Sequence, residues 1–587
     1  MSTWIHFASN TSVEALKIIA EHISQKLYIR VIEIDVRLPL DIKKSKYCCT
    51  HTYEDFLSEE ELEGIDQRAS DIAQNWFYIE GKDVTALSGF SMGKSVELSF
   101  FYDLILILKN VAIASKIFKN KTVENIFIGR GVSLKPEAWE KTAILSNAKF
   151  RHLSENQESK ILIPERFFSF SKRAVKRIKN IFSLSKDVGL TRSEAAFPKK
   201  GTIAFIKGRA TVSDWLQELG DNEFHLIEID ENSISVDLLL RLKLTIKYYL
   251  KWRNDREKIS ANPIWVYQKI NLYTIFAEYI KDLFFKKIPI NLSLAIAWNQ
   301  YLRRNRIEVL IVPWHELSTL QLLSCQSSGV QLLTLQDSWL PGSHFPIGYG
   351  RLMRTDLLCT WGKISTSWAQ SLPHCNRVID IGGPKSMEFW KNHTEVYSAN
   401  RAQTFTVLFT HQCWGAWSAF HSPLDTNDFF EMLAKAAKEL QNVQFICKIH
   451  PLVEHPLHEG KNRFRIIENQ VSNYGLENFS VTPKSLPMHE ALKICDVVIT
   501  YYSLTAVEAL VSGKSVIMMN LTRKRDLFPE LYSYGVALRA TNAEELISSI
   551  VSLRTASIHR SRTNTIHILN DIFSPSKSLT DVIRSQC

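Results

Sequence analysis

The chain has 587 residues, a formal net charge of +10 and 45% apolar residues, values typical of a globular protein with several domains. Glycine (22 residues) and proline (18 residues) are too scarce for a collagen-like or low-complexity chain. The nine cysteines are scattered without a Cys-x-x-Cys pair, so the sequence predicts neither a zinc site nor a disulfide framework. The positive charge favours an anionic partner, but it is too small to indicate a nucleic-acid binder.

The first 160 residues alternate between segments with strand and helix patterns. Predicted strands cover residues 4–8, 28–34 and 125–129, and predicted helices cover residues 13–25, 95–114 and a segment starting at residue 137. This alternation is typical of a parallel α/β sheet. The glycine patterns at residues 89–93 and 129–131 are too common to indicate a phosphate-binding loop. We assign no chemistry to this region.

A basic segment follows at residues 166–186, with seven Lys or Arg and no acidic residue. Phe170, Ala174 and Ile178 recur in it at helical spacing. A basic amphipathic helix of this kind can lie on an anionic membrane surface. A linker helix packed on its own domain is the alternative. We therefore expect a basic helical insert at about residues 160–200.

Beyond the insert, two runs of alternating strands and helices predict an α/β fold with two Rossmann-like lobes facing a cleft. The first run has strands at 202–207, 224–229, 309–312 and 331–335, with helices at 235–256, 264–304 and 317–325. The second has strands at 405–410, 444–449, 496–500 and 515–520, with helices at 428–440, 488–494, 505–511 and 542–553. We expect an acceptor-side lobe at residues 1–385, a donor lobe at 386–560, a tail at 561–587 and a hinge near Gly383.

Polar residues follow the strands of the second lobe, where open α/β sheets bind their ligands. The donor-binding candidates are His411, Gln412, Lys448, His450, Pro451, Ser503, Thr505 and Glu508. Two alternatives stay open for the last three: Ser503 or Thr505 caps the following helix, with Glu508 closing a capping box, or these side chains bind a phosphate and a sugar hydroxyl.

A metal site is not predicted. His450, His455, His458 and Glu459 resemble a ligand cluster, but their spacing fits neither His-Glu-x-x-His nor a paired Cys/His pattern. No Asp-x-Asp triplet for a metal-bound diphosphate occurs in the chain. We therefore expect no metal ion and no other cofactor.

The run CKIHP…SLPMHEALKICDVVITYYSLTAVEALVSGKSVIM resembles the donor lobe of GT-B transferases that build bacterial surface polysaccharides. The most similar groups are capsule-type Kdo transferases, polysialyltransferases and CDP-glycerol glycerophosphotransferases. They share the Lys-x-His-Pro element and the Glu-Ala-Leu-x-x-Gly-Lys helix–strand unit. The segments LLTLQDSWLPG, DLLCTWGK and VIDIGGPK are similar to the region that joins the two lobes in that group.

The resemblance implies that His450, Ser503 and Thr505 hold the donor phosphate and that Glu508 binds the ribose or sugar of the donor. His450 would also donate to the leaving phosphate. Where the family usually has His-Gly, this chain has Asp337-Ser338, so Asp337 becomes the candidate catalytic base or nucleophile. A turn-forming role of Asp337 is the alternative. Glu316, after His315 at the preceding strand end, is the second candidate base.

The resemblance implies a metal-independent glycosyltransferase that moves Kdo or a nonulosonate from a CMP-sugar to a surface polysaccharide or a lipid-linked glycan. A CDP-glycerol or polyol-phosphate transferase is the nearest alternative, and a non-catalytic nucleotide-sugar-binding or glycan-binding scaffold is an alternative of another class. A UDP-sugar epimerase would be shorter. The N-terminus lacks a secretory signal pattern and no apolar run approaches a membrane span, so we expect a cytoplasmic protein, with residues 166–186 able to reach an anionic inner membrane surface.

Overall fold

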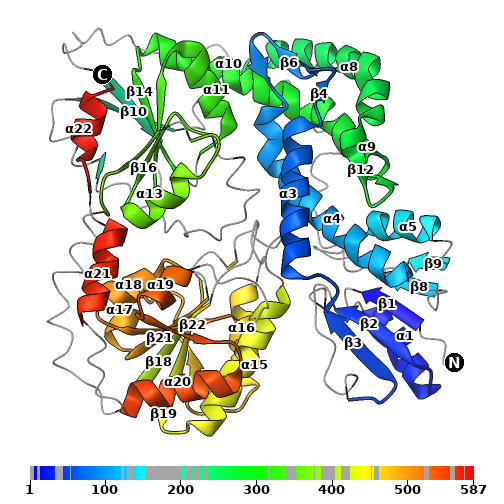
Figure 1. Cartoon of the computed structure of the whole chain (residues 1–587), viewed down its shortest axis with the longest axis vertical. Coiled ribbons are helices and arrows are strands. Elements are labelled where there is room, and N and C mark those ends of the chain that lie inside the picture. Colours follow the sequence, from blue (N-terminus) through cyan, green and yellow to red (C-terminus); the bar gives the residue numbers. More distant parts are fainter. Residues whose placement is uncertain are drawn as a thin grey trace, which may run out of the picture.

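The computed structural model contains three parallel sheets with helices packed on them and between them (Figure 1). It describes most of the chain. The main gaps are residues 1–4, 34–41, 120–124, 129–135, 153–200, 207–214, 338–351, 385–403, 412–422, 455–461, 521–527 and 556–561, with shorter ones that include 315–316, 451–452 and 502. The basic segment at 166–186 lies outside the described residues.

The first sheet has five strands in the order β3-β2-β1-β8-β9. Its elements are β1 (Ile5–Ser9), α1 (Val13–Ser24), β2 (Ile29–Glu33), β3 (Cys48–Thr52), β8 (Asn125–Ile128) and β9 (Lys149–His152). All its pairings are parallel, as the alternating pattern predicts. This sheet was predicted as part of the lobe that follows it and not as a separate unit.

A helical module connects this sheet to the rest of the molecule. It consists of α3 (Glu59–Asn75), α4 (Glu97–Phe118), α5 (Pro136–Leu145), α8 (Leu238–Ala261), α9 (Tyr273–Asp282) and α10 (Ile288–Arg304). Their buried apolar side chains form one core that also includes Trp314 and Trp368 of the second sheet's lobe. The module and that lobe therefore pack as one body.

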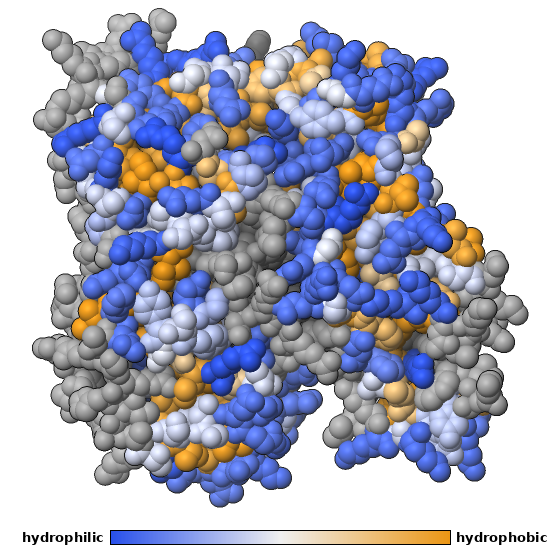
Figure 2. Space-filling model, in the orientation of Figure 1, coloured by the Kyte–Doolittle hydropathy of each residue, from blue (hydrophilic) through white to orange (hydrophobic). Residues whose placement is uncertain are grey.

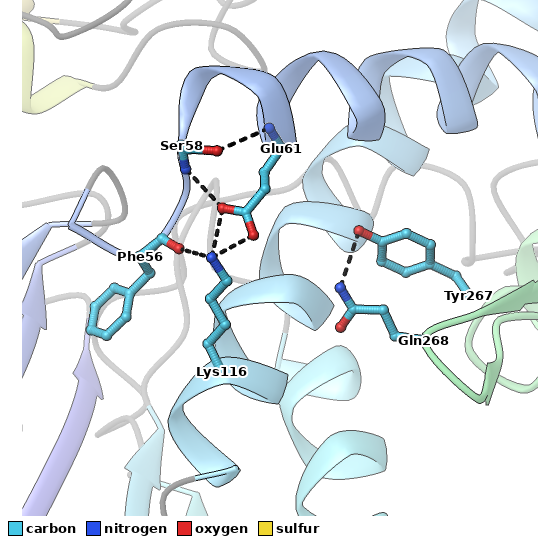
Figure 3. A network of polar contacts seen from close by, with 6 residues as sticks. All are labelled: Phe56, Ser58, Glu61, Lys116, Tyr267 and Gln268. Atoms are coloured by element: carbon cyan, nitrogen blue, oxygen red, sulfur yellow. Dashed lines mark hydrogen bonds and ion pairs between the residues drawn. The ribbon is translucent and has the colours of Figure 1, made fainter.

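The start of α3 is fixed to the end of α4 by a small polar network (Figure 3). The Ser58 hydroxyl accepts from the amide of Glu61, and the Glu61 carboxylate accepts from the Ser58 amide, which is a capping box. The Lys116 ammonium donates to the Phe56 carbonyl (2.7 Å) and to the Glu61 carboxylate (2.6 Å). This ion pair lowers the pKa of Glu61, but its exposure limits its stabilisation to at most about 1 kcal/mol.

The predicted helix at 264–304 is wrong in its first part. The segment begins with a hairpin, β12 (Val266–Tyr267) and β13 (Ile270–Asn271), followed by α9, the π-turn Leu283–Lys287 and α10. Gln268 and Lys269 form the turn with positive φ angles of 47° and 69°. Because neither is a glycine or an asparagine, the sequence carries no ordinary signal for this hairpin.

The second sheet has six parallel strands in the order β11-β10-β14-β15-β16-β17. Its elements are β10 (Thr202–Ile206), β11 (His225–Ile229), β14 (Val309–Pro313), α11 (Thr319–Ser328), β15 (Gln331–Leu335), β16 (Leu357–Thr360), α13 (Lys363–Gln370) and β17 (Val378–Asp380). Every residue of β14 and β16 is buried, as expected for a parallel sheet covered on both faces.

The third sheet has six parallel strands in the order β20-β19-β18-β21-β22-β23. The strands are β18 (Phe405–Thr410), β19 (Val443–Lys448), β20 (Phe479–Val481), β21 (Val497–Thr500), β22 (Ser515–Met519) and β23 (Ala537–Ala540). The helices are α15 (Pro423–Glu439), α16 (Arg463–Ser472), α17 (Met488–Lys493), α18 (Thr505–Val511), α19 (Pro529–Ser533) and α20 (Ala543–Thr555). This is the doubly wound order of a Rossmann fold, so the prediction of two Rossmann-like lobes is confirmed.

The segment predicted as a tail forms two helices, α21 (Arg562–Phe573) and α22 (Leu579–Arg584), which lie along the side of both six-stranded sheets (Figure 1). Their apolar side chains share a core with strands of both sheets. Gly362 and Gly383 make room for α21. A Cβ at Gly362 would lie 2.6 Å from the Ile572 carbonyl oxygen, and one at Gly383 would lie 2.2 Å from the Phe573 ring.

Among the described residues, one helical stretch, Lys94–Phe118, is long and apolar enough to cross a membrane. In its most apolar window, 61% is buried inside the protein, against α3 and α5.

Candidate functional site: the carboxyl edge of the third sheet

Three of the segments singled out in the sequence meet at one edge of the third sheet. β18 lies between β19 and β21 and is parallel to both, so the residues that follow these three strands emerge side by side. His411 follows β18, His450 follows β19 and Ser503 follows β21. The chain order reverses at β18, which makes this edge the switch point where Rossmann-like sheets bind ligands.

His411 lies at the base of this edge and is only 3% exposed. Its amide donates to the Lys448 carbonyl (2.9 Å), and its ring stacks on Phe430 of α15, with the ring planes inclined by 16°. Burial, followed by the positive charges of Arg463 and His450, lowers the pKa of His411 to about 3. The imidazole is therefore neutral near pH 7 and contributes no charge to the binding of an anion.

Lys448 is the last residue of β19, and its side chain lies on the face opposite to Cys447, which is in the core. The Lys448 ammonium donates to the carbonyl of Leu486, in the turn before α17 (2.7 Å). Burial lowers the pKa of Lys448. This lysine therefore fixes the turn to the strand, and its two remaining N–H donors are the ones that could reach a ligand.

His450 follows two residues later and is half-buried. Its carbonyl accepts a hydrogen bond from the amide of Val453 (3.1 Å). Its charge lowers the pKa of His411, so the two imidazoles lie close to each other. The structure thus brings His450 to the predicted edge.

Ser503 and Thr505 stand at the start of α18. The Ser503 hydroxyl accepts from the Thr505 amide (3.2 Å) and lies 2.9 Å from the Thr505 hydroxyl. Thr505 is the first helical residue and Leu504 is the N-cap, so the capping box considered for Thr505 and Glu508 is wrong. The two hydroxyls form a pair at the edge, and Glu508 is left available for another role.

Glu508 lies one turn into α18 and is half-buried. Burial raises the pKa of its carboxyl group to about 7. Among the residues that the structure describes, no side chain forms a hydrogen bond or an ion pair with this carboxylate. Because a buried carboxylate is costly without hydrogen-bond donors, a ligand with hydroxyl groups would stabilise it here.

Arg463 was not among the residues predicted from the sequence. This arginine begins α16, is half-buried, and lies close enough to His411 to lower its pKa. It supplies a permanent positive charge at this edge, whereas His411 is neutral and the Lys448 ammonium is hydrogen-bonded to the Leu486 carbonyl. The signal was present in the sequence as a cluster of cations, Lys461, Arg463 and Arg465, after the strand that ends at Lys448.

The carboxyl edge of the second sheet has a different character. Gln336, directly after β15, is fully buried: its side chain accepts from the Trp361 amide (2.8 Å) and donates to the Ser365 hydroxyl (3.1 Å). The Trp361 indole donates to the Gln336 carbonyl (2.7 Å). Asp337 comes next and is 1% exposed. Asp337 therefore lies at the predicted strand end, but its side chain is buried.

Four candidates from the sequence cannot be placed. Gln412, Pro451, His315 and Glu316 lie outside the described residues, as do three of the residues that resemble a metal cluster, His455, His458 and Glu459. In the described part of the chain, no three His, Cys, Asp or Glu side chains are grouped so that they could hold a metal ion.

Comparison with known proteins gives one informative match. Residues 390–521 match a family described as capsule polysaccharide biosynthesis protein, and this range contains every donor-binding candidate of the sequence analysis. No curated protein sequence matches the chain.

The solved structures that resemble this chain are distant. They include a UDP-GlcNAc 2-epimerase from Methanocaldococcus jannaschii in complex with UDP-GlcNAc and UDP (13% identity, 65% of this chain and 99% of that chain, TM-score 0.39). A glycosyltransferase from Rickettsia africae has 12% identity over 66% of this chain and 97% of its own, with a TM-score of 0.36. MurG from Acinetobacter baumannii has 13% identity over 64% and 99%, with a TM-score of 0.30. These values are too low to indicate a shared substrate.

The family match agrees with the predicted relationship to proteins of surface-polysaccharide synthesis over residues 390–521. Together with the two Rossmann-like lobes, it supports the prediction that the chain is a glycosyltransferase of capsule synthesis. The donor, the acceptor and the membrane partner are separate questions.

Proposed function

We propose that this protein is a capsule-polysaccharide glycosyltransferase that binds its nucleotide-sugar donor at the carboxyl edge of the third sheet. The observation that carries the proposal is Glu508: a carboxyl group with a raised pKa and no partner among the described residues, one turn beyond the Ser503–Thr505 hydroxyl pair. It lies within the stretch that matches the capsule family. Its carboxylate would accept hydrogen bonds from the ribose or sugar hydroxyls of the donor.

The preferred donor is a CMP-linked acidic sugar of the Kdo or nonulosonate type. Such a donor has a single phosphate. The described part of the edge offers it the guanidinium of Arg463, the half-buried imidazole of His450 and the hydroxyls of Ser503 and Thr505. The sequence has no Asp-x-Asp triplet, so we propose that the reaction does not need a metal ion. Arginine and hydroxyl donors would then stabilise the charge of the leaving phosphate.

In the proposed reaction, a carboxylate takes the proton of an acceptor hydroxyl, whose oxygen forms a bond to the anomeric carbon. The bond from that carbon to the phosphate oxygen breaks, and CMP leaves with the electron pair, stabilised by Arg463 and by a proton or hydrogen bond from His450. Asp337 and Glu316 are the two candidates for the carboxylate. In a retaining reaction, Asp337 would instead attack the anomeric carbon itself. Because Asp337 is buried, either role requires that its surroundings open when the acceptor binds.

The proposed acceptor is a growing surface glycan or a lipid-linked glycan on the cytoplasmic side of the membrane. A basic segment such as 166–186 would hold the enzyme near anionic lipid. We propose this membrane contact because a lipid-linked acceptor is held at the membrane surface.

A thermal-shift panel of CMP, CDP, UDP and GDP tests the donor directly. A ligand present at about 100 times its Kd stabilises the folded state by about 2.7 kcal/mol, which raises the Tm visibly. We expect a selective response to CMP. Selectivity for CDP would favour a polyol-phosphate transferase, selectivity for UDP or GDP would overturn the donor, and no response to any of the four would contradict the proposal.

Two arginines in α16 provide a matched pair for the same assay. Arg463 faces the edge and is half-buried, whereas Arg465 is exposed two residues later. Arg463→Ala should reduce the CMP-induced shift strongly, and Arg465→Ala should retain it. Equal shifts in both variants would remove Arg463 from the phosphate site.

A further inference from the structure

The helix α8 has apolar residues on two opposite faces. Leu244, Tyr248 and Ile259 are buried in the core of the helical module. At 3.6 residues per turn, a second set of apolar residues lies on the other side of the helix. This outer face consists of Leu238, Leu239, Leu242, Ile246, Tyr249 and Leu250, whose exposed fractions range from 41% to 63%.

Side chains on the inner face of α8 make hydrogen bonds and packing contacts with the helical module, and these contacts fix the direction of the outer face. The Tyr248 hydroxyl donates to the Thr85 carbonyl (2.8 Å), and the Lys251 ammonium donates to the Val84 carbonyl (2.8 Å). Tyr248 also makes an edge-to-face contact with Phe284 (6.3 Å between ring centroids). Rotation of α8 to bury its outer leucines would break these contacts.

The outer face is bordered by positive charge. Between residues 238 and 254 the chain has five Lys or Arg and no Asp or Glu. Lys243 and Lys247, one turn apart, are both exposed, and Arg253 continues the exposed face toward the end of the helix. An exposed row of leucines beside cations is uncommon on a surface that contacts only water. It is typical of helices that lie in the interface of an anionic bilayer.

The position of α8 in the molecule suits such a contact. Figure 1 shows α8 along the upper edge, at the end opposite to the third sheet, and Figure 2 shows apolar side chains among hydrophilic ones along that edge. A bilayer could therefore contact this edge while the proposed donor site faces the aqueous phase.

We propose that the outer face of α8 is a docking surface for an anionic lipid bilayer. The leucine and isoleucine side chains enter the interface between headgroups and acyl chains, and Lys243, Lys247 and Arg253 contact the anionic headgroups. Each basic residue near such a surface contributes about a fivefold increase in binding. The proposal does not depend on the donor chemistry, and it is separate from the membrane role predicted for residues 166–186.

The test uses the full chain and vesicles of phosphatidylcholine, either pure or with about one third phosphatidylglycerol, in a co-sedimentation assay. The test variant is Leu242→Ser/Ile246→Ser/Leu250→Ser. Its matched control is Ile494→Ser/Val551→Ser/Ile566→Ser, which replaces three apolar residues of similar exposure (41% to 51%) on the C-terminal side of the molecule. We expect the parent and the control to bind the anionic vesicles and the test variant to bind at least tenfold more weakly.

A second pair of variants tests the charge and does not alter the apolar residues. Lys243→Glu/Lys247→Glu should abolish binding to the anionic vesicles, whereas Lys438→Glu/Arg554→Glu, with the same change in net charge at exposed positions elsewhere, should retain it. This pair keeps the proposal testable if the serine variant does not fold, as judged by its thermal melting curve.

Several results would overturn the proposal. The parent could fail to bind the anionic vesicles, or the α8 variants could bind as the controls do. Deletion of residues 166–186 could alone abolish binding, which would assign the membrane contact to that segment. Gel filtration could show that the parent is an oligomer that the α8 variants dissociate, which would make the outer face a contact between protein chains.

Discussion

The two six-stranded sheets have the same parallel construction but use their carboxyl edges differently. At the edge of the second sheet, Gln336 and Trp361 satisfy each other's hydrogen bonds and are fully buried. At the edge of the third sheet, the carboxyl group of Glu508 has a raised pKa and no partner among the described residues. Polar residues near the strand ends therefore serve packing in the second sheet, whereas in the third sheet we propose that they bind the donor.

Glycine-containing motifs of the second sheet explain this difference. The Trp-Gly pair at 361–362 and the Gly-Gly pair at 382–383 lie against the C-terminal helix α21, which packs on both six-stranded sheets. Trp361 and Phe573 contact each other, with ring centroids 5.8 Å apart. The resemblance associates these motifs with the region between the lobes. In this chain they form the surface on which the C-terminal helix α21 packs.

The largest expected effect is that of Gly362→Ala on stability. The new Cβ would lie 2.6 Å from the backbone carbonyl oxygen of Ile572, which cannot move without moving α21. We expect a loss of about 3 kcal/mol in the free energy of unfolding, measured by urea denaturation. Gly64→Ala, in the exposed face of α3 with no atom within 4 Å of its Cβ, is the control and should be neutral or stabilise by about 0.5–1 kcal/mol. Equal effects of the two changes would contradict the packing role.

A smaller effect on stability is expected from Gln336→Met. The change retains the volume of the side chain but leaves the Trp361 amide without its acceptor and the Ser365 hydroxyl without its donor. A buried N–H without an acceptor costs about 2 kcal/mol, which urea denaturation would detect. The affinity of the folded protein for CMP should not change. A large loss of affinity would mean that the second-sheet edge also belongs to the donor site.

Glu508→Gln should have the opposite effect on stability. Because the pKa of Glu508 is raised to about 7 in the folded state, its contribution to stability is complete below the ordinary pKa of about 4.5 and is lost as the pH rises through 7. Glutamine does not ionise, so its free energy of unfolding should not fall in this pH range. The difference in this free energy between variant and parent should therefore be larger at pH 8 than at pH 4.5, by on the order of 2 kcal/mol. Urea denaturation at the two pH values measures this difference. A difference that is independent of pH would show that Glu508 ionises normally.

The smallest expected effect is that of Lys448→Met. The variant loses the hydrogen bond from Lys448 to the Leu486 carbonyl, which stabilises the folded state by about 1 kcal/mol. If Lys448 serves only this turn, the variant binds CMP as the parent does. If it also contacts the phosphate, as the sequence analysis predicts, the affinity falls by about tenfold in a calorimetric titration.

Much of the two lobes could be predicted from the sequence because apolar runs and helix boundaries are clear there. The observed bounds of β15, β18 and α18 agree with the prediction, and Gly513, with a φ of 68°, follows the C-cap residue Ser512 of α18. His450, Ser503 and Thr505 reach the predicted edge because strand direction alone places them there.

Other features depend on contacts that a sequence pattern does not reveal. The hairpin at Gln268–Lys269 has positive φ angles at residues that rarely adopt them, and the periodicity of its flanks resembles that of a helix. The bonds of Lys448 and the neutrality of His411 follow from burial, which only the folded chain defines. The outer face of α8 was hidden because apolar residues on two opposite sides give no clear amphipathic pattern.

The most direct test of the donor site is a calorimetric titration of CMP into the parent protein and into Glu508→Gln at pH 8. We predict micromolar-to-millimolar binding by the parent and a loss of about tenfold or more in the variant, because the amide accepts hydrogen bonds from ribose hydroxyls less strongly than a carboxylate does. The variant should lose affinity while it gains stability. Equal affinity in the two proteins would contradict the placement of the donor at the carboxyl edge of the third sheet.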